Sequence, residues 1–178
     1  MVKEKADDMP DIKEGMFKGL ALSFVIVVLD QLTKSYAAQE LMLYQSHPVF
    51  PGVNFTLMHN TGAAFSFLSD AGGWQRVFFI TLASAVSLFI LIWMYGLSEK
   101  KKWLFFALAF VLGGAIGNLW DRITLGYVID FIDVSLSFLP WRLFNPWPAF
   151  NIADSAIFIG AIMLIIDAIW LDDSENES

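Results

Sequence analysis

The chain has 178 residues, of which 57% are hydrophobic and only 16% are charged, and its net charge is −7. One domain of this length cannot bury so much apolar surface in a single core, which argues against a soluble protein and favours a membrane protein. Apart from a short acidic tail the acids are not pooled, so the charge does not indicate a cationic partner. With no cysteine and two histidines, we expect no disulfide, no metal site and no cofactor.

Four apolar segments are long enough to cross a membrane, because about 20 helical residues span ~30 Å of hydrocarbon. We expect these spanning helices at about 17–38, 75–97, 103–122 and 152–171. Between them lie two long connections, 39–73 and 124–150, and apolar and polar residues alternate over 53–58 as in a half-buried strand. The sequence predicts a mainly α integral membrane protein, a single domain over residues 1–178, with four transmembrane helices and a small extracytoplasmic β-sheet.

Basic residues indicate the orientation of these helices. Seven of the eleven Lys and Arg residues lie at or before the start of the first span, or join the second and third spans. Cytoplasmic segments carry such an excess, so we expect both termini in the cytoplasm and both long connections outside it. Residues 1–16 are not followed by a signal-peptide cleavage site, and we expect them to stay attached.

Polar residues from separate segments are expected at the outer membrane boundary, counting ~1.5 Å per helical residue. Acids at that depth are costly unless they are paired, protonated or facing water, so they usually mark a site. Ion pairs or hydrogen bonds that tie helices together are the alternative explanation. The residues concerned are Asp30 and Lys34 on the first span, Asn118, Asp121 and Arg122 on the third, and Asp154 on the fourth.

Small and capping residues lie near these polar groups. A strip of three glycines, Gly113, Gly114 and Gly117, lets another helix or a peptide approach the third span closely. Asn151 is placed to cap the fourth span, with Asp154 in its first turn beside the positive helix end.

A membrane site with carboxylates, no Cys and few His suits acid/base hydrolysis by two Asp residues. Two close carboxylates cannot both ionise cheaply, so one stays protonated and donates a proton while the other deprotonates a water. Asp130 and Asp154 are the best-placed pair. We expect Asp133 to be solvated if it begins a loop, and Asp167 to reach the cytoplasmic surface.

Two other functions fit the residues alone. A Ser/Lys protease has Lys34 and serines such as Ser155 near the outer boundary, although Asp30 would keep the lysine charged and therefore a poor base. A proton-linked transporter uses buried Asp residues as carriers, although no inverted repeat is visible.

Five motifs occur in a fixed order along the chain. They are DQLTK at 30–34, NTGAAF at 60–65, GGAIGNLWDR at 113–122, VIDF at 128–131 and FNIADS at 150–155. Each is weak alone, but together they are specific, and from Asp30 to about Asp167 the chain resembles the lipoprotein signal peptidases, or signal peptidase II, of bacterial cytoplasmic membranes.

The resemblance implies a membrane aspartyl endopeptidase that removes the signal peptide from a diacylglyceryl-modified prolipoprotein just before the lipidated Cys. It places the catalytic dyad at Asp130 and Asp154. It also implies a periplasmic β-rich cradle from the first long connection, susceptibility to the antibiotic globomycin, and no cofactor. The matching positions that bind substrate or support the site are Asp30, Lys34, Asn60, Gly114, Asn118, Asp121, Arg122, Val128 and Asn151.

The expected partners are diacylated prolipoproteins and membrane lipid, with no nucleic acid, and a monomer suffices. The expected location is the bacterial inner membrane, with the active site near its outer face. We expect the signal helix to lie against the glycine strip, and the substrate backbone to pair with the strand at 54–58. Because 24 positions separate Asp130 from Asp154, more than is usual in the family, a Trp- and Pro-rich loop over 134–149 is expected on the membrane interface.

Overall fold

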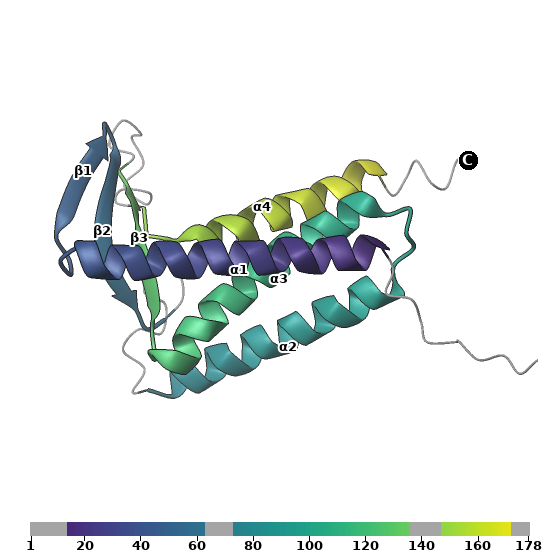
Figure 1. Ribbon diagram of the computed structural model, residues 1–178, viewed down its shortest axis with the longest axis horizontal. Helices are drawn as coiled ribbons and strands as arrows, with labels where there is room; N and C mark the ends of the chain where they lie inside the picture. The colour runs from purple at the N-terminus through teal and green to yellow at the C-terminus, as the bar shows by residue number, and fades with distance from the viewer. Residues whose placement is uncertain (1–13, 63–72, 136–146, 172–178) are drawn as a thin grey trace, which may run out of the picture.

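The computed structural model of the chain describes residues 14–62, 73–135 and 147–171. Four helices form a bundle, and a three-stranded sheet lies at one end of it, here called the sheet end (Figure 1). The helices are α1 (Glu14–Glu40), α2 (Trp74–Gly96), α3 (Lys102–Thr124) and α4 (Ile152–Ile166), which continues as a π-helix, η3 (Asp167–Leu171). The strands are β1 (Ser46–Phe50), β2 (Val53–Asn60) and β3 (Val128–Val134).

All four helices are long and apolar enough to cross a membrane, which confirms the predicted fold class. Their bounds agree with the expected spans to within about one turn when η3 is counted with α4. The start of α1, the end of η3 and the connection between α2 and α3 all lie at the end opposite to the sheet (Figure 1).

The central helix of the bundle is α3. Of its most apolar stretch, 61% is buried inside the protein, against 22% for α1 and 17% each for α2 and α4. The three outer helices each pack against α3. They turn most of their own surface outward, and in a membrane that surface faces lipid, which suits exposed side chains such as Phe24, Phe89 and Phe158.

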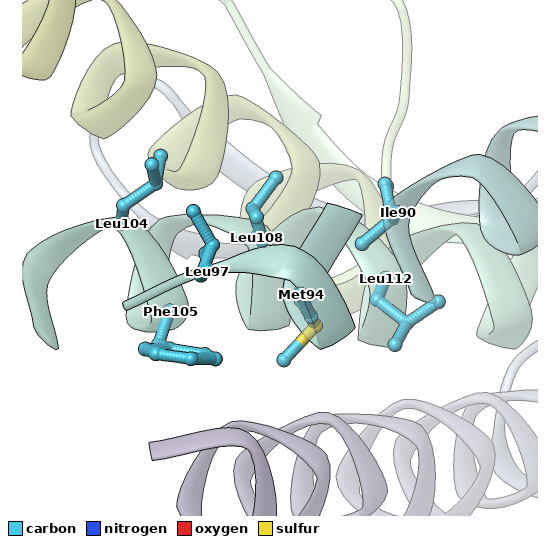
Figure 2. Close-up of a cluster of buried hydrophobic side chains, with 7 residues drawn as sticks. All are labelled: Ile90, Met94, Leu97, Leu104, Phe105, Leu108 and Leu112. Carbon is cyan, nitrogen blue, oxygen red and sulfur yellow. The ribbon is translucent and has the colours of Figure 1, made fainter. Parts of the chain in front are cut away.

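A cluster of buried apolar side chains joins α2 to α3 at the end away from the sheet (Figure 2). Because lipid is as apolar as these side chains, close packing rather than exclusion from water favours this contact. The cluster contains Ile90, Met94, Leu97, Leu104, Phe105, Leu108 and Leu112.

The glycines of α3 allow α1 and α4 to approach its backbone. A side chain at Gly113 would meet Ile26 of α1 at 2.9 Å, and one at Gly114 would collide with the carbonyl oxygen of Ala153 on α4. Neighbouring helices therefore fill the glycine strip. The expectation that a signal helix lies against it was wrong.

The sheet has the order β1-β2-β3, with antiparallel pairing throughout. The expected strand became β2, whereas β3 comes from the second long connection and was not predicted as a strand. Val53 to Thr56 of β2 are paired with β1, and Leu57 bridges Leu43, so over 54–57 the edge of β2 away from β3 is occupied by the chain itself. The expectation that substrate backbone pairs there was wrong. The outer edge of β3 is also partly occupied, since Phe131 N and Ile132 N donate to Phe150 O at 3.1 and 2.9 Å.

Replacing Gly114 by Ala is expected to destabilise the protein by roughly 1–3 kcal/mol or more, because the added methyl group meets the main chain of α4. The measurement is unfolding of the purified protein in detergent. Gly96→Ala is the matched control, since nothing lies within 4 Å of a side chain at that position. Wild-type stability of Gly114→Ala would contradict the packing described for α3 and α4.

Candidate active site

Asp130 lies in the middle of β3 and is 2% exposed. Asn60, at the end of β2, is paired with Val128 of β3. Val128 and Asp130 are two residues apart on β3 and so share a face of the sheet, which places the Asn60 side chain beside Asp130. The Asn60 amide donates to Asp130 Oδ2 at 3.0 Å, and the Asn151 amide donates to Oδ1 at 2.8 Å. Side-chain amides thus hold both oxygens of this carboxyl group.

Asp154 lies in the first turn of α4, which Asn151 caps as predicted. The Asn151 side chain accepts from Asp154 N at 2.9 Å, and Asp154 Oδ2 accepts from Asn151 N at 3.2 Å. Asn118 on α3 donates to Asp154 Oδ1 at 2.7 Å. The reciprocal cap and the contact from α3 fix the Asp154 carboxyl group at the sheet end.

Asn151 connects the two Asp residues that the sequence analysis paired. It is 0% exposed, and it bonds Asp130 through its side chain and Asp154 through both its side chain and its main chain. Segments from β3 and α4 are thereby brought together at one point.

The asparagines around the pair have defined amide orientations. In each, the carbonyl oxygen accepts from a group that can only donate, so the amide nitrogen is turned toward a carboxyl group. The donors are Gly62 N for Asn60, Lys34 Nζ for Asn118 and Asp154 N for Asn151.

Lys34 lies at the centre of a buried ionic cluster. Its ammonium group is 2.8 Å from Asp30 Oδ2, 2.9 Å from Asp121 Oδ2 and 2.9 Å from Asn118 Oδ1. These acceptors use all three N–H groups of the ammonium, and the side chain is 1% exposed. A lysine held in this way cannot act as a general base, which disfavours the Ser/Lys mechanism.

The ionic cluster also holds the backbone that carries the two Asp residues of the pair. Asp30 Oδ1 accepts from Ala153 N at 2.9 Å, and Asp121 Oδ2 accepts from Ile129 N at 3.2 Å, in each case one residue before a member of the pair. Gln31 completes the cluster by donating to Asp121 Oδ1 at 2.8 Å. The sequence analysis missed Gln31, although its place in the DQLTK motif was an available signal.

Arg122 is half-buried in the last turn of α3. Its Nη2 donates to Gly62 O at 3.0 Å, and its Nη1 lies 3.5 Å from Asn118 O. The Phe79 ring faces the guanidinium, with 5.0 Å between Cζ and the ring centre. Nε is buried and has no hydrogen-bond partner within residues 14–62, 73–135 and 147–171.

The electrostatic environment favours a proton on the pair. Burial, followed by the negative charge of Asp154, raises the pKa of Asp130 to about 7, against the lowering effect of the Asn60 and Asn151 amides. This carboxyl group can therefore hold a proton near neutral pH. Among the described residues, no group of three His, Cys, Asp or Glu side chains could hold a metal ion.

Other residues from the sequence analysis lie outside this network. Val128 is buried at the start of β3. Asp133 belongs to the same strand rather than to a loop, and it accepts from Thr56 Oγ1 at 3.0 Å, so the condition under which it was expected to be solvated is not met. Most of the Trp- and Pro-rich loop, over 136–146, lies outside the described residues.

A family model described as signal peptidase (SPase) II matches residues 22–170. The chain belongs to the signal peptidase II family. Signal peptidase II is an aspartic-type peptidase, so the protein is a peptidase with several membrane spans. Membership in this family selects the Asp-based hydrolase over the Ser/Lys protease and the transporter.

Curated relatives and solved structures agree with this assignment. Lipoprotein signal peptidases from Acinetobacter baumannii and Pseudomonas putida are 50% and 48% identical over 167 and 172 residues. These matches cover 90% and 94% of this chain and 92% and 98% of the relatives. Two solved structures are described as bacterial membrane enzymes. One has a TM-score of 0.76 at 29% identity, and the match covers 91% of this chain and 92% of that one. The other has a TM-score of 0.72 at 28% identity, and the match covers 86% of this chain and 94% of that one.

Replacing Lys34 by Met is expected to destabilise the protein by about 3–5 kcal/mol, because Asp30 and Asp121 would stay buried without a cation. Adding Asp30→Asn to the variant should restore part of the loss. Unfolding in detergent measures both effects. Lys18→Met is the control, since it removes a lysine from an exposed pair with Glu14 and should unfold like the wild type. A stable Lys34→Met protein would be inconsistent with the ionic cluster.

Proposed function

We propose that the protein removes the signal peptide from diacylglyceryl-modified prolipoproteins, cutting just before the lipidated Cys, with Asp130 and Asp154 as its catalytic residues. Asn151 carries this proposal, because it bonds both carboxyl groups at one end of a bundle able to span a membrane. The substrate class is supported by the similarity to lipoprotein signal peptidases.

The reaction needs one ionised and one protonated carboxyl group. The ionised group takes a proton from water, the water oxygen attacks the scissile carbonyl carbon, and the protonated group gives its proton to the carbonyl oxygen. When the C–N bond breaks, the first group protonates the leaving amine and a hydroxyl of the intermediate returns a proton to the second. The pair ends with one proton, as it began.

The surroundings of the pair support this proton count. The raised pKa of Asp130, about 7, follows first from burial and then from the charge of Asp154, so the two groups are not both ionised below about pH 7. The proton belongs to the pair as a unit. Amides from Asn60, Asn118 and Asn151 orient the carboxyl groups without neutralising them.

The sheet end faces away from the cytoplasm in this proposal. The lysine-rich connection between α2 and α3 and the start of α1 lie at the opposite end, and such basic segments stay in the cytoplasm (Figure 1). Both termini are then cytoplasmic, and the protein resides in the bacterial inner membrane. The diacylglyceryl group holds the substrate in the outer leaflet, at the depth of the pair. One copy of the chain and no cofactor suffice.

Asp130→Asn and Asp154→Asn are each expected to lower the cleavage rate by about 100- to 10,000-fold or more, because each removes an acid or base from the reaction. The measurement is cleavage of a diacylated prolipoprotein by purified protein. Asp133→Asn is the matched control on β3, since Asp133 accepts from Thr56 and takes no part in the network, and it should cleave at the wild-type rate. Wild-type turnover in both dyad variants would rule out the mechanism.

The pH dependence of cleavage is expected to report the proton on the pair. Because the pKa of Asp130 is raised to about 7, kcat/KM should fall as the pH rises above about 7, where the pair loses its last proton. Asn60→Ala removes an amide that favours ionised Asp130, so it should move the falling limb to higher pH. Asn54→Ala, on the same strand but opposite Asp133 rather than Asp130, should keep the wild-type profile. An unmoved limb in Asn60→Ala would contradict this assignment.

A further inference from the structure

The first turn of α2 carries a cation where the helix dipole disfavours one. Arg76 lies in that turn, near the positive end of α2. Its guanidinium donates to main-chain carbonyls at the end of α3, from Nε to Arg122 O at 3.0 Å and from Nη2 to Ile123 O at 3.0 Å. The last carbonyls of a helix lack partners within the helix and attract cations. Arg76 thus joins the start of α2 to the end of α3.

Phe79, one turn further along α2, contacts the side chain of the same α3 residue. The Cζ of Arg122 lies 5.0 Å from the centre of the Phe79 ring, in a cation–π arrangement. Arg122 is therefore held twice from α2, at its main chain by Arg76 and at its guanidinium by Phe79. The rest of α2 packs chiefly against α3.

The turn after α3 also lies against Arg76. Gly126 has a φ of +89°, and a side chain there would meet the Nη1 of Arg76 at 3.4 Å. The guanidinium of Arg76 is thus close to the backbone that leads from α3 into β3. The same contact supports both Arg122 and the approach to the strand that carries Asp130.

One N–H donor of Arg122 is buried and left without a partner among the described residues. Its Nη2 donates to the main-chain oxygen of Gly62. The main-chain N–H of Gly62 donates to the Asn60 side-chain oxygen, and the Asn60 amide donates to Asp130. Nε of Arg122 is the buried donor that has no partner within the described ranges. A buried charged donor without a partner is costly, so a ligand that supplies an acceptor is favoured there. In a peptidase, a main-chain carbonyl of the substrate has the required chemistry.

We infer that Arg76 and Phe79 are positioning residues, which orient Arg122 so that its Nε–H donates to a carbonyl oxygen of the substrate peptide near the scissile bond. This inference rests on the proposed function, because it needs a peptide at the Asp130–Asp154 pair. It assigns to α2, which contributes no member of the pair, a part in substrate binding.

The test is a double-mutant cycle on the purified full-length protein, with cleavage of a diacylated prolipoprotein as the readout. Arg76→Ala and Phe79→Leu are each expected to raise KM about 5- to 10-fold with little change in kcat, because a substrate contact is weakened while the pair is intact. In an Arg122→Lys background, which lacks Nε, the same changes should alter KM by less than about twofold.

Two further variants and a stability measurement separate positioning from a purely structural role. Arg76→Lys keeps the charge but presents one ammonium to two carbonyls, so its KM should lie between those of wild type and Arg76→Ala. Phe89→Leu makes the same change as Phe79→Leu at a site of α2 that is 61% exposed, and it should keep the wild-type KM. Equal KM increases in the wild-type and Arg122→Lys backgrounds, with lowered unfolding temperatures, would overturn the inference.

Failure of the inference differs from failure of the proposed function. A wild-type protein that does not cleave the prolipoprotein would overturn both. Wild-type cleavage that is lost in Asp130→Asn, together with additive effects of Arg76→Ala and Arg122→Lys, would overturn the inference alone.

Discussion

The buried ammonium of Lys34 holds the sheet end of the molecule together. It pairs with carboxylates from α1 and α3 and bonds the carbonyl of Asn118, whose amide then faces Asp154. The same carboxylates accept N–H groups from the first turn of α4 and from β3. Breaking such a pair leaves a charge without compensation in a low-dielectric environment, so one cation constrains three helices and a strand.

Asn118 separates this cation from the Asp pair. Direct contact with an ammonium would favour ionisation of both carboxyl groups, and a pair without a proton could not act as an acid. The amides of Asn60, Asn118 and Asn151 orient the carboxyl groups by hydrogen bonds and leave their charge in place. The site therefore combines strict geometry with a carboxyl group that can hold a proton near neutral pH.

Hydropathy predicted the four helices well, since lipid-facing helices must be long and apolar whatever their neighbours are. The strand β3 was missed because its first four residues are all buried, so VIDF has no alternation of apolar and polar residues. The glycine strip and β2 were recognised from the sequence. The sequence did not show that the segments packed against them belong to the chain itself rather than to a substrate. Counting depths along the helices and the five motifs predicted that Asp30, Lys34 and Asn118 lie at the site. The ion pair and hydrogen bond that connect them were seen only in the structure.

The contact between Asp30 and Ala153 joins residues that are 123 positions apart, with consequences for biosynthesis. Among the four helices α4 is translated last, and it supplies Asp154, Asn151 and the N–H group that Asp30 accepts. A nascent chain with only α1, α2 and α3 in the membrane has a single member of the pair and no cap beside it. The network around the two Asp residues is therefore completed only when the fourth helix joins the other three.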